Sequence, residues 1–203
     1  MKSVHWLFIL SLGFLVLGCA KAGTYSLSLR YQPVKEFSSL QTKMGSHMAM
    51  TPFKDERPET LYIGAHTNLQ GDSSYFKSQP FPLEKAIQDS LSEALSRYGI
   101  ETVPVPNWDG KPESLKNMEI DSVLMIEIKR FWTEAKASAF RTTIKTVVRF
   151  VIHLGVKKEG KVYTRNVEME KEIIEARATP GKMEAMINRI LTDVFDAYFS
   201  NPY

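Results

Sequence analysis

The segment IKTVVRFVIHL, residues 144–154, decides the fold because its apolar and polar side chains alternate with the two-residue period of a β strand. Phe150 and Ile152 fall on one face of such a strand, whereas Arg149 and His153 fall on the other. A strand of this kind buries its apolar face against a core and leaves its polar face in water. The segment therefore predicts a half-buried strand of an antiparallel sheet.

A second alternating segment, KVYTRNVEMEKE at residues 161–172, follows this strand, and the dipeptide Glu159-Gly160 lies between the two. A two-residue turn at this dipeptide predicts a β hairpin in which the numbers of paired residues sum to 319. The predicted pairs are Phe150 with Met169 and Ile152 with Val167 on the apolar face, and Arg149 with Glu170 on the polar face. A slip of one residue would turn every side chain of the second strand to the wrong face.

The rest of the chain reads as short strands and two amphipathic helices. Strands are expected at residues 25–31, 48–53, 61–64, 100–105 and 122–135. One helix is expected from Leu83 to Tyr98, ended by Gly99, and another begins at Thr179-Pro180. The segment from Ala65 to Pro82, rich in Ser, Gly, Asn and Pro, is expected to be a loop. This order predicts a single α/β (α+β) domain, with a mixed, mostly antiparallel sheet and two helices packed on one face.

The composition excludes several classes of protein. The 203 residues include 26 basic and 23 acidic side chains, which gives a formal charge of only +3. Because the two signs are interspersed, whereas nucleic-acid binders gather Lys and Arg, nucleic acid is not an expected partner. The single cysteine, Cys19, excludes an intramolecular disulfide and a metal site built from several thiolates.

Cys19 directly follows a leader whose residues 6–17 are uncharged and predominantly apolar. Twelve residues of helix cover roughly 18 Å, which is short of the ~30 Å hydrocarbon core, so a cleaved secretory leader is expected rather than a spanning helix. The run LVLGC, residues 15–19, resembles the bacterial lipobox, whose cysteine is lipidated before the leader is removed. The alternative is a plain signal peptide followed by a chance buried cysteine.

The lipobox resemblance implies a signal peptide at residues 1–18 and a single periplasmic domain at residues 19–203, held on the membrane by acylated Cys19. Lipoproteins of this kind in two-membrane bacteria go to the outer membrane unless Asp follows the cysteine. Ala20 follows here. The implied location is the outer membrane, facing the periplasm.

The sequence offers no catalytic, metal or cofactor site. His47, His66 and His153 are separated by 19 and 87 residues and are expected to be surface or loop histidines. Nucleophile-elbow and phosphate-binding motifs are missing from the sequence. The row Glu168, Glu170 and Glu172 has the spacing that paired glycosidase carboxylates could use, but a solvated strand face partnered by basic residues is the simpler interpretation. We therefore expect no enzyme and no small-molecule substrate.

The best candidate for a partner surface is the turn from Asp55 to Pro58, with Arg57, together with the expected loop at residues 65–82. This loop is long for a compact domain, and long loops are usually functional or mobile. It carries the aromatic residues Tyr75, Phe76 and Phe81. Two alternatives remain open: the aromatic residues fold back to cover an edge of the sheet, and Asp55 and Arg57 form an ion pair that only fixes the turn. Trp108 and Trp132 fit either an interface anchor or partial burial.

Four segments resemble the YajG-like bacterial lipoproteins: TPFKDERP at 51–58, YIG at 62–64, the helix from Leu91 that ends in RYG at 97–99, and residues 122–128. That family is largely uncharacterised and implies no catalytic residue. The layout is more distantly similar to lipoproteins that activate penicillin-binding proteins and to the curli secretion channel lipoprotein. The expected function is a non-catalytic binding or assembly module of the outer membrane, with an envelope protein as partner. The alternatives are a structural subunit of an envelope transport or secretion complex, and an enzyme.

Overall fold

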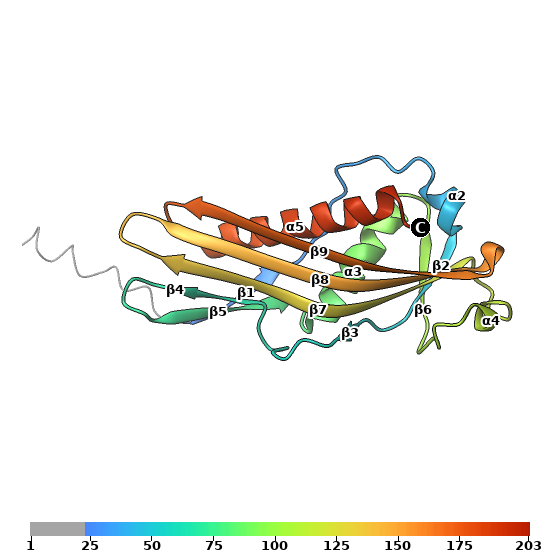
Figure 1. Ribbon diagram of the computed structural model, residues 1–203, viewed down its shortest axis with the longest axis horizontal. Helices are drawn as coiled ribbons and strands as arrows, with labels where there is room; N and C mark the ends of the chain where they lie inside the picture. Colours follow the sequence, from blue (N-terminus) through green and yellow to red (C-terminus); the bar gives the residue numbers. More distant parts are fainter. Residues whose placement is uncertain (1–22) are drawn as a thin grey trace, which may run out of the picture.

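A computed structural model describes residues 23–203, so the predicted signal peptide and Cys19 lie outside the described residues. The described chain folds into one elongated, twisted sheet with its two long helices over one face (Figure 1). Its strands are β1 (Thr24–Ser28), β2 (His47–Met50), β3 (Lys54–Asp55), β4 (Gly64–Thr67), β5 (Ser73–Gln79), β6 (Glu101–Pro104), β7 (Ser122–Ala137), β8 (Thr142–Val156) and β9 (Lys161–Glu175). Its α-helices are α2 (Leu40–Met44), α3 (Leu83–Ser96), α4 (Pro112–Leu115) and α5 (Pro180–Ser200).

The strand β7 organises the sheet. One edge of β7 pairs antiparallel with β8 along its length, and β8 pairs antiparallel with β9. The other edge of β7 pairs in parallel with the short strands β2, β3 and β4 in turn. β5 pairs antiparallel with β4. At the edges, β1 pairs in parallel with β5, and β6 pairs in parallel with β2. The predicted mixed α+β sheet is confirmed: its long strands are antiparallel, and its parallel pairings are all short.

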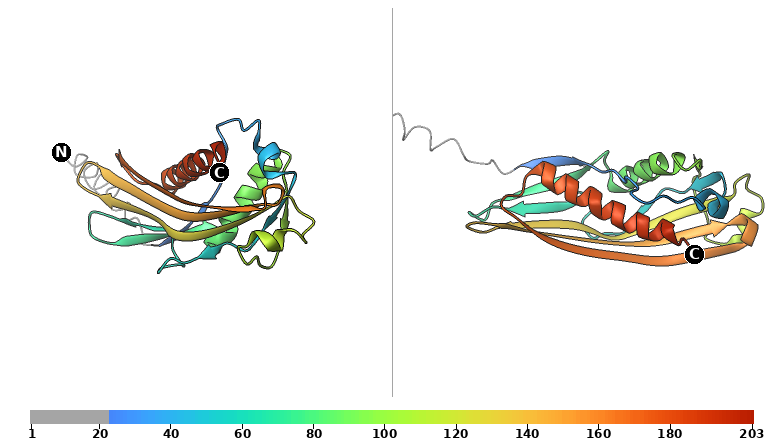
Figure 2. Two further views of the ribbon diagram at one scale, coloured as in Figure 1. Left: turned by 45° about the vertical axis from the view of Figure 1, so that its right-hand side comes forward. Right: turned by 90° about the horizontal axis from the view of Figure 1, so that it is seen from above.

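The long helices α3 and α5 lie over the same face of the sheet, as the view from above shows (Figure 2). They bury the inward row of β8, and the Phe150 ring stacks on the Phe195 ring of α5 at 5.6 Å between centroids. The predicted start of α5 is confirmed, because the Thr179 hydroxyl accepts a hydrogen bond from the Lys182 backbone N–H at 3.3 Å. The short helix α2 has no counterpart in the sequence expectations.

The face turned away from α3 and α5, which we call the outer face, is covered only at one end. There α4 and its flanking loop bury a small second cluster that contains Trp108, Leu115 and Met125. Gly155 of β8 makes room for this cluster, because a Cβ atom at that position would lie 2.9 Å from the Trp108 ring. In the described chain no helix covers the remainder of the outer face.

The register of the β8–β9 hairpin differs from the predicted one by two residues. Paired numbers sum to 317, so Phe150 lies opposite Val167 and Arg149 lies opposite Glu168. The connection is a 3-10 turn at Lys157–Glu159 followed by Gly160 with φ 61°, rather than a two-residue turn. A shift of two leaves every side chain on its predicted face, so Phe150 is buried as expected.

The prediction that residues 65–82 form a loop is wrong. Most of this segment is the β4–β5 hairpin, whose turn at Asn68–Asp72 is closed by a 2.9 Å hydrogen bond from the Asn68 N–H to the Asp72 carbonyl. The Asn68 side chain accepts two further backbone hydrogen bonds inside the turn, from Gln70 and Asp72. These contacts hold a turn that its polar composition alone did not distinguish from a mobile loop.

Candidate functional site

Arg57 fixes the turn that follows β3. Its guanidinium donates to both carboxylate oxygens of Asp55, at 2.8 and 2.7 Å. Its other N–H groups donate to the backbone carbonyls of Thr60, Tyr62 and Phe131, at 3.2, 2.9 and 3.1 Å. The five donors of the guanidinium thus have five acceptors, and the Phe131 carbonyl ties the turn to β7. Both charged side chains are buried, at 4% and 6% exposure.

Two hollows are relevant here. One, of about 490 Å³, lies at the far end of the sheet, where Asp121 and Lys157 line it. The other, of about 450 Å³, lies beside this turn. We call the second one the turn hollow. It is lined by Arg57, Pro58, Glu59, Lys129, Arg130, Phe131 and Trp132. Its β7 wall contains a β-bulge, at which the pairing with β8 shifts between Ile128 and Arg130. Because bulges re-aim side chains, this one sends Arg130 and Trp132 to the outer face and Phe131 to the core.

The extra residue of the bulge, Lys129, lies between two carboxylates. Its ammonium pairs with Glu127 at 2.7 Å and with Glu56 of the turn. The hydrogen bond to Glu127, then that to Glu56, raises the pKa of Lys129, and the same Lys129 contact lowers the pKa of Glu127. The wall of the turn hollow therefore stays charged at neutral pH, with Arg130 exposed to solvent.

Exposed aromatic side chains lie on the same face as the turn hollow. The sheet register places Tyr75 opposite Ala65, and Ala65 beside Glu134, so Tyr75 shares the outer face with Trp132. The Tyr75 ring stacks on the Tyr62 ring at 4.7 Å, and the Lys77 ammonium lies 5.5 Å from the Tyr62 ring centroid. The same ammonium lies 5.9 Å from the ring of Phe81. We call Tyr62, Tyr75, Lys77 and Phe81 the aromatic strip.

The structure separates the residues proposed from the sequence into two groups. Tyr75 and Phe81 are exposed and belong to the aromatic strip. Phe76 is only 2% exposed and packs in the main core, which corrects its assignment to a partner surface. Asp55 and Arg57 are buried and paired with each other, which fits the alternative of an ion pair that fixes the turn.

Sequence reasoning missed Lys129 and Arg130 as parts of the hollow. The signal was present, because the inward residues of β7 have even numbers up to Ile128 and odd numbers from Phe131 onward. A change of parity inside one strand is what a bulge requires. Tyr62 and Lys77 were missed because their role comes from β4–β5 pairing, which was not predicted.

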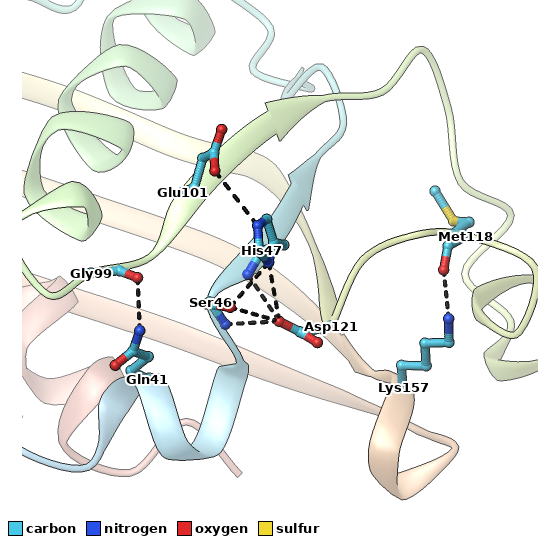
Figure 3. A network of polar contacts seen from close by, with 8 residues as sticks. All are labelled: Gln41, Ser46, His47, Gly99, Glu101, Met118, Asp121 and Lys157. Carbon is cyan, nitrogen blue, oxygen red and sulfur yellow. Dashed lines mark hydrogen bonds and ion pairs between the residues drawn. The ribbon is translucent and has the colours of Figure 1, made fainter.

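A network of polar contacts lies at the hollow at the far end of the sheet (Figure 3). There the Asp121 carboxylate accepts hydrogen bonds from the backbone N–H groups of Ser46 and His47, at 2.8 and 3.0 Å. Those bonds, the His47 one above all, lower the pKa of Asp121. The Lys157 ammonium donates to the Met118 carbonyl at 2.6 Å. Because these groups satisfy one another's hydrogen bonds and join α2, β2 and β7, we assign the cluster a structural role.

The remaining polar rows have simple partners. Arg149 pairs with Glu168 at 2.7 Å and Lys145 pairs with Glu170 at 2.6 Å, which fits the expected solvated strand face.

Among residues 23–203, no group of three or more His, Cys, Asp or Glu is arranged to hold a metal ion. Over the same range, no helix is both long and apolar enough to cross a bilayer.

Solved structures show what this fold is similar to. Protein XCC0632 from Xanthomonas campestris, of the family DUF330, matches 87% of this chain and 91% of its own, with a TM-score of 0.55 and 12% identity. Lipoprotein GNA1162 from Neisseria meningitidis matches 74% of this chain and 99% of its own, with a TM-score of 0.40 and 14% identity. The first likeness supports the α+β fold, whereas the second is too low to support an argument.

Neither protein-family profiles nor curated proteins match the sequence. Membership in the YajG-like family therefore stays a prediction from the segments that resemble it.

Proposed function

We propose that the chain is an outer-membrane lipoprotein, anchored through acylated Cys19, whose periplasmic domain binds an envelope protein without catalysing a reaction. The observation that carries the binding role is the aromatic strip next to the turn hollow on the outer face. Aromatic and arginine side chains are enriched in protein interfaces, and here Trp132, Arg130 and Tyr75 lie on one face.

The geometry of the turn supports this proposal. All five N–H donors of the Arg57 guanidinium form hydrogen bonds within the domain, so the wall of the hollow is held in place before a partner binds. Trp132 is half-buried on the outer face and pairs across the sheet with Val147, which is buried. A rigid surface with aromatic anchors loses little conformational entropy on binding.

The test is photo-crosslinking in cells. A photo-crosslinking amino acid replaces Tyr75 or Arg130 in the full chain, and replaces Val34 as a control, because Val34 is 81% exposed and its backbone N–H donates to Asp196 of α5, which covers the opposite face. The proposal predicts one envelope-protein adduct at positions 75 and 130 that is missing at position 34. A second change, Trp132→Ala, should remove that adduct.

Adducts no stronger at positions 75 and 130 than at position 34, or adducts unaffected by Trp132→Ala, would contradict a binding role for the outer face. An adduct with a subunit of a transport or secretion machine would favour the alternative of a structural subunit in such a complex.

A further inference from the structure

Exposed apolar side chains gather at one end of the sheet. Nine large apolar side chains are exposed in the described chain: Tyr25, Val34, Leu61, Leu69, Tyr75, Phe81, Val103, Phe140 and Ile174. Five of them lie at the end of the sheet where β1 begins, in or beside the strand ends and turns there: Tyr25, Leu69, Tyr75, Phe140 and Ile174. Singly scattered apolar residues need no explanation, but a group at one end of an elongated domain does.

The sheet register defines this end, which we call the β1 end. Thr24 of β1 pairs with Tyr75 near the start of β5, and Thr67 at the end of β4 pairs with Lys136 of β7. The turns at residues 68–72 and 138–141 therefore project beyond the sheet at the same end (Figure 1). The polar Asp121 cluster lies at the opposite end of β7, about 50 Å away along its 16 residues.

Each turn presents its apolar residue on a hydrogen-bonded frame. In the β7–β8 turn, the backbone N–H of Ser138 donates to the Arg141 carbonyl at 2.7 Å, and Phe140 between them is 94% exposed. In the β4–β5 turn, which Asn68 holds as described above, Leu69 is 59% exposed. Phe140 is almost fully exposed and Leu69 is more than half exposed, so burial in the core accounts for neither side chain.

The sequence brings the proposed anchor to this same end. Four residues, 20–23, lie between Cys19 and Thr24, and the five Cα-to-Cα steps of this stretch span at most about 17 Å when fully extended. An acylated Cys19 would hold the start of β1 within that distance of the bilayer. The β1 end is thus the part of the domain that the tether keeps next to lipid.

We infer that the β1 end is a second membrane contact, in which Phe140 and Leu69 enter the interfacial region of the bilayer that holds acylated Cys19. This inference rests on the proposed lipid anchor. The contact would fix the orientation of the domain, because two turns and one acyl anchor define a plane. The elongated domain would then project the Asp121 end away from the membrane.

The charges at this end do not oppose the contact. Lys136, Arg141 and Arg177 are exposed there, and the acidic residues are Asp72, Glu134 and Glu175. Lys136 pairs with Glu134 at 2.9 Å, and Lys182 at the start of α5 pairs with Glu175 at 2.5 Å, so the charges of this end nearly cancel. The apolar side chains therefore carry the attraction, and the basic ones are suited to lipid phosphates.

The test uses the mature, acylated full chain, reconstituted at low density in vesicles of phosphatidylethanolamine and phosphatidylglycerol. Acylation consumes the thiol of Cys19, so Phe140→Cys, Leu69→Cys or Val34→Cys supplies a single free thiol for an environment-sensitive fluorophore. Val34 is the matched control, because it is apolar and exposed but lies beside Asp196, far along α5 from its start at the β1 end.

The inference predicts that labels at positions 140 and 69 emit at shorter wavelength than the label at 34 and are quenched several-fold more by lipids that carry a nitroxide near the carbonyl region. Labels at 140 and 69 that match the control in both measurements would overturn it. A shift to shorter wavelength without lipid quenching would place a second copy of the chain there and also overturn it.

Mass spectrometry of the same samples separates this inference from the proposed function. A chain without acyl groups on Cys19 would overturn both. An acylated chain whose labels at 140 and 69 behave like the label at 34 would overturn only the membrane contact.

Discussion

The guanidinium of Arg57 donates two hydrogen bonds to the carboxylate of Asp55, and both side chains are buried. A planar fork with five donors suits this position, whereas an ammonium offers three. Arg57→Lys should therefore leave backbone carbonyls of the turn without a donor and lower the free energy of unfolding by about 2 kcal/mol. Urea unfolding of the two proteins measures this difference. A variant as stable as the wild type would show that the hydrogen bonds from the guanidinium to the turn carbonyls do not stabilise the fold.

Two neighbouring residues of β8 should respond very differently to truncation. Phe150 is fully buried between the sheet and α5, so Phe150→Ala should cost about 3 to 5 kcal/mol of unfolding free energy. Arg149 extends into water beside Glu168, so Arg149→Ala should leave the denaturation midpoint nearly unchanged. The reverse ranking in chemical denaturation would mean that the inward face of β8 is wrongly assigned.

Substitutions of the adjacent residues Tyr75 and Phe76 should distinguish an effect on binding from an effect on stability. Phe76 is buried, so Phe76→Ser should lower the melting temperature by several degrees, given that about 1 kcal/mol shifts a domain of this size by roughly 2 to 4 °C. Tyr75 is exposed on the outer face, so Tyr75→Ser should barely change melting but should weaken crosslinking to the envelope partner at position 130. Calorimetry and the crosslinking yield are measured on the same pair of variants. Full crosslinking with Tyr75→Ser would remove Tyr75 from the proposed contact.

Stability near pH 4 should depend on Asp121. Its pKa is lowered in the folded protein, chiefly by the hydrogen bond from the His47 backbone N–H, so the ionised form stabilises the fold. This contribution is fully present above the unfolded pKa of about 3.9 and is lost as pH falls through the lower folded pKa. Asp121→Asn should therefore cost about 1 kcal/mol at pH 7, and the gap to the wild type should close below about pH 4. A gap that stays constant down to pH 3 would show that the charge of Asp121 is not the cause.

Side-chain alternation predicts which face of a strand is buried, but not how far two strands slide along each other. A slide of two residues keeps Phe150 and Arg149 on their faces, so the β8–β9 turn at residues 157–160 alone sets the register. Gly160 was identified as a turn residue, yet the 3-10 geometry before it was not. Long elements such as α3, α5 and β7 could be predicted, because each carries many periodic residues.

The site was harder to predict, because distant segments build it. Asp55 and Arg57 stand out in the sequence, but their burial depends on the Phe131 carbonyl of β7, which lies 74 residues away from Arg57. The β4–β5 hairpin was missed because its strands are short and polar, so little apolar alternation marks them. Tyr75 and Phe76 are neighbours in sequence, and only strand pairing decides which of them faces outward.

The central claim is that Cys19 is a lipid anchor, and metabolic labelling with palmitate tests it most directly. The full chain is expressed in a two-membrane bacterium beside the variant Cys19→Ser, and label incorporation and membrane fractionation are measured for both. We predict that the wild type incorporates label and sediments with the outer membrane, whereas Cys19→Ser incorporates none and is recovered as an unprocessed or soluble periplasmic product. Equal labelling of the two proteins would contradict the claim.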